Sequence, residues 1–132
     1  MPGPEPPVVG SPRDWLRRAR GNLARARQPK PPEALWEDLC FDAQQAAEKA
    51  VKALLVFRRI DFPKTHDIGR LLQLLTDGGI EIPGSIRRAP ELTAYAWEAR
   101  YPGDYEPATE DVYRWAVALA ETVVRWAETT VG

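Results

Sequence analysis

The residues in this sequence that are best suited to chemistry on a phosphate group lie within one short stretch, Arg58 to Leu72. It contains His66, the only histidine among 132 residues, and the adjacent pair Arg58 and Arg59. An imidazole can accept or donate a proton near neutral pH because its unperturbed pKa is about 6.5. A guanidinium stays charged and can bind a phosphate through two hydrogen bonds. The stretch therefore combines a proton carrier with phosphate-binding cations.

One reaction that such a pair would suit is metal-independent cleavage of RNA. In that reaction a base removes the proton of the 2'-hydroxyl, an acid protonates the leaving 5'-oxygen, and a cation stabilises the charged phosphorane. We assign phosphate binding to Arg59 and proton transfer to His66. One histidine cannot be base and acid in the same step, so the enzyme hypothesis predicts a homodimer whose Arg-His pairs meet across its two-fold axis.

Each of these residues also has a structural interpretation. His66 and the arginines could form a loop and a helix start that bind a ligand without cleaving it, and Lys64 could be a solvated lysine instead of a phosphate ligand. The choice of arginine is open, because Arg59 leaves six residues before His66 and Arg58 leaves seven. Thr65 and Asp67 fit helix-capping roles better than catalytic ones.

Two helices are expected before this stretch. Ser11, followed by Pro12, predicts the start of the first one, which should end before the proline-rich run that follows it. The second should run from near Glu33 to the arginine pair, because this segment lacks Gly and Pro and has a broad apolar face. Glu48 and Lys52 are spaced to form an i,i+4 ion pair, which we place on the opposite, polar side of that helix.

Three further helices are expected after the arginine pair. Thr65 should cap a helix over about residues 66–76 that ends at Gly78-Gly79. Another is predicted between residues 86 and 97, and Thr109 should cap a last helix that continues towards the C-terminus. No segment has the sustained alternation of a strand. The prediction is an all-α antiparallel bundle of about five helices.

Length and composition fit one domain, with 44% hydrophobic and 28% charged residues and a net charge of -1. Residues 1–11 are rich in Pro and Gly, which predicts a disordered or extended tail before a single helical domain over residues 12–132. Residues 1–70 carry 13 basic and 9 acidic side chains, a net charge of +4, whereas residues 71–132 carry 5 and 10, a net charge of -5. Basic residues recur on one face of the first helix, which we interpret as a solvated face rather than a phosphate track: Arg13, Arg17, Arg20 and Arg27.

Cysteine usage and hydropathy favour a cytoplasmic protein. Cys40 is the only cysteine and lies in an apolar segment, so a disulfide within the chain is excluded and a zinc site is not expected. The first residues do not have a basic start followed by a long apolar run, and no run approaches the roughly 20 apolar residues that a membrane span needs, so we expect neither export nor insertion. The sequence has no phosphate-binding Gly-rich loop and no metal-ligand cluster, so we expect no cofactor and no metal.

Three runs of the sequence, together with the order and length of the expected helices, closely resemble the HEPN domain (higher eukaryotes and prokaryotes nucleotide-binding domain). The runs are Ala43 to Ala50, Pro63 to Asp67, and Ala99 to Gly103, within a resemblance from about Leu35 to the C-terminus. The resemblance implies a helical bundle that dimerises. It also implies a partner, since many members are encoded beside a minimal nucleotidyltransferase as toxin and antitoxin.

The same resemblance bears on catalysis. Catalytic members of the family are metal-independent endoribonucleases marked by an Arg, four to six intervening residues and a His. Arg59 and His66 resemble this motif, since six residues separate them. The residue after the Arg is usually polar in that motif, whereas Ile60 follows it here. The alternative function is a subunit that binds a nucleotide or docks a nucleotidyltransferase without cleaving RNA.

A predicted loop before the last helix supplies two further candidates for nucleotide or RNA binding. Arg100 could contact a phosphate, and Tyr101 offers a ring on which a base can stack. A structural turn is the competing interpretation, in which Pro102 and Gly103 direct the chain and Tyr101 fills the end of the bundle.

Overall fold

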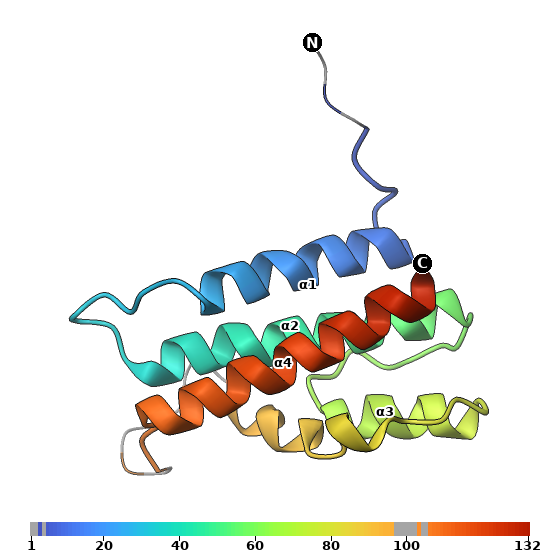
Figure 1. Ribbon diagram of the computed structural model, residues 1–132. Helices are drawn as coiled ribbons and strands as arrows, with labels where there is room; N and C mark the ends of the chain where they lie inside the picture. The colour runs from blue at the N-terminus through green and yellow to red at the C-terminus, as the bar shows by residue number, and fades with distance from the viewer. Residues whose placement is uncertain (1–2, 4, 97–102, 104–105) are drawn as a thin grey trace.

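The computed structural model describes residues 3, 5–96, 103 and 106–132. Over these residues the chain forms four α-helices and two 3₁₀ helices and no strand, so the predicted all-α bundle is confirmed (Figure 1). The helices are α1 (Pro12–Ala26), α2 (Trp36–Phe57), α3 (Ile68–Asp77), η1 (Gly84–Ile86), η2 (Ala89–Tyr95) and α4 (Glu110–Val131).

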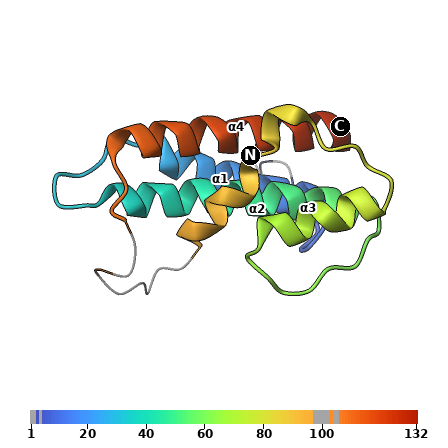
Figure 2. The ribbon, with the colours of Figure 1, turned by 90° about the horizontal axis from the view of Figure 1, so that it is seen from below.

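The central element is α2, which packs against α1, α4, α3 and η2. Helices α1, α2 and α4 run side by side, and α3 lies beside the C-terminal half of α2 (Figures 1 and 2). The neighbouring helices can approach α2 closely because four alanines on it are small and fully buried, which are Ala43, Ala46, Ala47 and Ala50. A helix this completely surrounded has little circumference left for solvent, which explains the breadth of its apolar stripe.

Two of the predicted helix starts are confirmed. The Oγ of Ser11 accepts a hydrogen bond from the backbone N–H of Asp14 at 3.2 Å, and Pro12 is the first residue of α1. The Oγ1 of Thr109 accepts from the backbone N–H of Val112 at 3.2 Å. Both caps use local side-chain hydrogen bonds, which is why they can be predicted from a few residues.

The start of α3 was predicted wrongly. The helix begins at Ile68, and its cap is Asp67, whose carboxylate accepts from the N–H of Arg70 at 3.2 Å. The hydroxyl of Thr65 instead accepts from the N–H of Asp67 at 3.1 Å. Since Asp competes better than Thr for this capping position, His66 remains in the loop before the helix.

Two other boundaries also differ from the prediction. Helix α2 begins at Trp36 rather than near Glu33, and the Asp38 carboxylate accepts from the N–H of Leu35 at 2.9 Å. The segment expected to form a helix over residues 86–97 contains the 3₁₀ helices instead, in part because Pro90 supplies no amide donor. Within the described part of the chain, no helix is long and apolar enough to cross a membrane.

Candidate functional site

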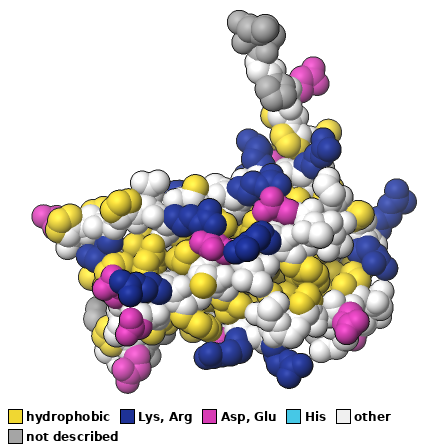
Figure 3. Space-filling model, viewed as in Figure 1, with side chains coloured by type: hydrophobic (Ala, Val, Ile, Leu, Met, Phe, Trp, Pro, Cys, Tyr) yellow, Lys and Arg dark blue, Asp and Glu magenta, His cyan; other side chains and the backbone are white. Residues whose placement is uncertain are grey.

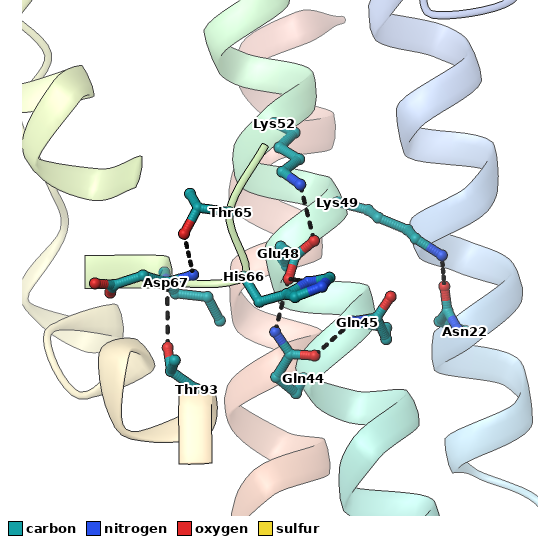
Figure 4. A network of polar contacts seen from close by, with 11 residues as sticks. Asn22, Gln44, Gln45, Glu48, Lys49, Lys52, Thr65, His66, Asp67 and Thr93 are labelled. Carbon is teal, nitrogen blue, oxygen red and sulfur yellow. Dashed lines mark hydrogen bonds and ion pairs between the residues drawn. The ribbon is translucent and has the colours of Figure 1, made fainter. Parts of the chain in front are cut away.

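His66 lies in the loop between α2 and α3, where its ring rests against the side of α2 (Figure 4). Its Nδ1 is 2.8 Å from Oε1 of Glu48. The imidazole is 45% exposed, whereas the Glu48 side chain is 3% exposed. A buried carboxylate on the central helix therefore holds a histidine that solvent can reach.

The contacts of Glu48 determine which nitrogen of His66 carries a proton. Gln44 donates to Oε1 at 2.9 Å, and Lys52 donates to Oε2 at 2.9 Å. The Oε1 of Gln44 accepts in turn from Gln45 at 2.7 Å (Figure 4). With its oxygens accepting from Gln44 and Lys52, the Glu48 carboxylate favours the tautomer of His66 that donates from Nδ1 and has its lone pair on Nε2.

The structure contradicts the prediction that Glu48 and Lys52 lie on the polar side of their helix. They do form the i,i+4 ion pair, but their exposed fractions are only 2% and 7%. The Lys52 ammonium lies 5.6 Å from the ring of Trp15 and 5.9 Å from that of Phe62. Helix α1 and the loop after α2 therefore cover the pair, and burying two charges in this way requires each to have a partner.

Sequence reasoning missed Glu48 as a functional candidate, although one signal was present. Gln44, Glu48 and Lys52 form a polar line at i+4 spacing directly beside the alanine stripe of α2. The breadth of that stripe leaves too little circumference for this line to be solvated. A line of polar residues on such a helix predicts a buried network.

Arg59 follows the C-terminal end of α2 in a left-handed conformation. The N–H of Ile60 donates to the carbonyl of Leu55 at 2.9 Å, and the N–H of Arg59 donates to that of Val56 at 3.0 Å. This pair of hydrogen bonds defines a helix end at which glycine is the usual residue. Arg59 has a φ of 57° and is the only described residue other than glycine with a positive φ.

The side chain of Arg59 lines a shallow hollow of about 430 Å³ at the end of α2. Its other walls come from the residues that follow or precede it, which are Val56, Ile60, Asp61 and Phe62. His66 is not part of this lining, so the structure does not place the two predicted catalytic residues in one pocket. Phe62 lies between the hollow and the Glu48 network. It lines the hollow, and its ring also lies near Lys52, the ion-pair partner of Glu48.

The other predicted site residues have less distinctive surroundings. Arg58 is the C-cap of α2, and its N–H donates to the carbonyl of Leu54 at 3.0 Å. The side chains of Arg58 and Lys64 are exposed. Arg100 and Tyr101 lie outside the residues that the structure describes.

The described residues contain neither a cluster of metal ligands nor an exposed thiol. No group of three or more metal-ligating side chains occurs there. Burial, with a smaller effect from the charge of Glu37, raises the pKa of the Cys40 thiol to about 12. Because the thiolate is the nucleophilic form, Cys40 is unreactive near neutral pH.

Comparisons with known proteins agree with the fold. The family model described as the HEPN domain matches residues 12–130. The crystal structure of ST0689, an archaeal HEPN homologue, is 29% identical, with 92% of this chain and 98% of that chain covered and a TM-score of 0.72. The crystal structure of TT1696 from Thermus thermophilus is 30% identical over the same shares, with a TM-score of 0.73. No curated protein matches the chain significantly.

Proposed function

Since the chain belongs to the HEPN family, we propose that it is a metal-independent endoribonuclease in which His66 transfers protons and Arg59 binds the scissile phosphate. The observation that supports this most directly is the 2.8 Å contact between Nδ1 of His66 and the buried carboxylate of Glu48. A carboxylate that orients an imidazole in this way is a common arrangement for a general base.

The proposed reaction is a transfer of the phosphate within the RNA. Nε2 of His66 takes the proton from the 2'-hydroxyl, and the 2'-oxygen attacks the phosphorus while the bond to the 5'-oxygen breaks. Arg59 stabilises the negative charge on the phosphorane. The products are a 2',3'-cyclic phosphate and a 5'-hydroxyl, which takes its proton from the acid.

The acid in this proposal comes from a second copy of the chain. His66 is the only histidine, so a homodimer with the partner's His66 near the leaving oxygen would supply base and acid together. This arrangement would also explain why Arg59 and His66 of one chain need not share a pocket, because each could complete the site of the other copy. A minimal nucleotidyltransferase is the proposed partner of the dimer, by similarity to other members of the family.

Cleavage of end-labelled RNA in EDTA tests the reaction. His66→Ala and Arg59→Ala should each abolish fragments that end in 2',3'-cyclic phosphate, whereas Arg58→Ala is the neighbouring control and should keep the activity. The control also decides between the two arginines that the spacing leaves open. Fragments that persist in His66→Ala would contradict the proposal.

Glu48→Gln tests the positioning of His66 separately from its chemistry. A glutamine amide can donate to the ring as well as accept from it, so the preference for a proton on Nδ1 should weaken. We expect slower cleavage with unchanged RNA affinity, together with a change in the imidazole ¹⁵N chemical shifts. Unchanged shifts would show that Glu48 does not control the tautomer.

The hollow beside Arg59 supports a second candidate function, a subunit that binds a nucleotide without cleaving RNA. Its apolar walls from Val56, Ile60 and Phe62 would accept a base, and Arg59 would accept a phosphate. This function predicts nucleotide binding that survives His66→Ala and no new RNA ends with the wild-type protein.

A further inference from the structure

At the seam where α1 packs against α2, the acidic side chains are buried, whereas arginines paired with them reach the surface. Three carboxylates beneath it are buried, since Asp14, Asp42 and Glu48 have exposed fractions of 2%, 6% and 2%. The arginines paired with two of them reach the surface. Their side chains are 50% exposed for Arg18, which pairs with Asp14 at 3.1 Å, and 73% exposed for Arg25, which lies 3.6 Å from Asp42.

Lys49 lies on the α2 side of the same seam. Its Nζ donates to Oδ1 of Asn22 at 2.7 Å, and Nδ2 of Asn22 donates to Oδ1 of Asp42 at 3.2 Å. Burial lowers the pKa of Lys49, the charge of Glu48 partly opposes this shift, and the charge of Arg18 adds to it. Figure 4 shows Lys49 reaching from α2 across to Asn22 on α1. The ammonium is therefore held between the two helices, and Lys49 directly follows Glu48, which contacts His66.

Ion pairs elsewhere in the molecule cancel their charges at the surface. Both side chains are exposed in the pair of Arg88 with Glu91, at 65% and 51%, and in the pair of Arg114 with Glu110, at 69% and 54%. Two other arginines of α1 pair with glutamates of α4, Arg20 with Glu128 and Arg27 with Glu121. These glutamates are more exposed than the seam carboxylates. Basic and acidic side chains accordingly lie next to one another along α1 and α4 in Figure 3.

The cations of the seam are also regularly arranged. Arg18 and Arg25 are seven residues apart and so lie on one face of α1, about 10.5 Å from each other along the helix axis. A hydrogen bond to the buried Asp14 carboxylate orients the Arg18 guanidinium before any ligand arrives, and the Asp42 carboxylate lies 3.6 Å from Arg25. Ligand binding then requires less ordering of side chains, which favours affinity.

We infer that Arg18, Lys49 and Arg25, which we call the cationic seam, bind consecutive backbone phosphates of single-stranded RNA and lead the strand to His66. This inference rests on the proposed function for the choice of RNA as the polyanion. A single strand fits better than a duplex, because attack by a 2'-hydroxyl requires a backbone that can rotate into line. The seam binds phosphates only, so it adds affinity without sequence preference.

The test is the salt dependence of RNA binding. Fluorescence anisotropy with a labelled oligouridylate would measure affinity in the His66→Ala background, in which the proposed cleavage cannot occur. Arg18→Gln with Arg25→Gln should reduce the slope of log affinity against log salt by about 1.4, since each single-strand phosphate contact contributes about 0.7. Over a tenfold range of salt, this difference in slope amounts to about 25-fold in affinity. If the double variant and the wild type bind equally at 1 M salt, the variant should therefore bind about 25-fold more weakly at 0.1 M.

Matched variants separate this effect from a general loss of charge or fold. Arg88→Gln with Arg114→Gln removes two exposed, paired arginines outside the seam and should leave the slope unchanged. Arg18→Lys with Arg25→Lys keeps the charges and should restore most of the affinity. Lys49→Gln adds an independent test, because its partner Asn22 is neutral and no buried carboxylate loses its only partner. It should reduce the slope by about 0.7.

Equal slopes for the seam variants and the wild type would overturn the inference and would favour an acidic protein surface as the ligand of the seam. The results that would contradict the proposed function are different from those that would contradict the seam. If wild-type protein cuts no RNA but the seam variants still lose binding and slope, the seam is supported and catalysis is not. If cleavage depends on His66 while the slopes do not change, catalysis is supported and the seam is not.

Discussion

The C-terminal ends of α2 and α3 use the same backbone hydrogen bonds but different residues at the position that matters most. In each case the third residue beyond the helix donates its amide to a carbonyl of the last turn, and the residue before it is left-handed. That residue is Gly79 after α3, with a φ of 88°, and Arg59 after α2, with a φ of 57°. Glycine adopts this conformation without strain, whereas arginine costs about 1 kcal/mol more.

The fold is locally less stable at Arg59 than a glycine at the same position would make it. A local cost at Arg59, beside a hollow and next to the loop that carries His66, is typical of residues retained for their side chain rather than for the backbone. The two ends are also in contact. A side chain at Gly78 would meet Cδ1 of Ile60 at 2.6 Å, so the residue after Arg59 packs directly on the end of α3.

Arg59→Gly should have the largest effect and should separate stability from function. Removing the guanidinium should lower the rate of RNA cleavage about 100-fold or more, as expected for the loss of a group that stabilises transition-state charge. Removing the backbone strain should stabilise the fold by about 1 kcal/mol. Cleavage kinetics and urea unfolding measure the two effects.

Arg59→Ala is the matched control for that variant. It should lose the same activity without the gain in stability, because alanine keeps a Cβ in the left-handed conformation. Full activity in both variants would show that Arg59 is only a helix-end residue and would leave Arg58 as the candidate.

Gly78→Ala should have the next largest effect, because it displaces the side chain that joins the two helix ends. The new Cβ would lie 2.6 Å from Cδ1 of Ile60, so this terminal methyl group must move, and the alanine should destabilise the fold by about 1 kcal/mol, the lower end of the usual cost of overpacking. Since Ile60 adjoins Arg59, RNA cleavage should also fall. Thermal unfolding and cleavage rates would be measured together, and a stability loss with unchanged cleavage would show that the two ends are not coupled.

Gly79→Ala should have a smaller effect that is confined to stability. No atom lies within 4 Å of the position that a Cβ would take, so the cost is only that of the left-handed backbone, about 1 kcal/mol. Cleavage should stay at the wild-type rate because the side chain faces open space. Unfolding by urea at neutral pH would measure the cost, and an unchanged midpoint would mean that the α3 end is not rigid.

The smallest effect concerns a helix start and is lost in acid. The N–H of Gly10 and the guanidinium groups of Arg17 and Arg18 lower the pKa of Asp14. A lowered pKa stabilises the fold above the ordinary value of about 3.9, and this contribution is lost as the pH falls below it. Asp14→Asn should therefore be less stable than wild type at pH 7, with a difference that shrinks below about pH 4. Unfolding midpoints across this range would test the sign, and a constant difference would contradict it.

Much of the fold could be predicted because its signals are local. Ser11 and Thr109 cap the helices that follow them, and Gly79 ends α3 at the expected place. The failures near the site were also local, since Asp67 rather than Thr65 caps α3 and the competition between neighbouring polar residues is finely balanced. The candidate site was harder to predict, because Glu48 precedes His66 by 18 residues and meets it only after α2 and its loop have packed.

The sequence by itself determined the all-α architecture, the presence of the long central helix and the nearness of Arg59 and His66 along the chain, because hydrogen bonds and apolar periodicity act over a few residues. The tertiary structure alone decided that Glu48 and Lys52 are buried, which nitrogen of His66 donates, and which arginines of α1 are held by carboxylates beneath the surface. The physical reason is burial. The partner of a charged group matters most where water is excluded, and only packing between distant segments decides where that is.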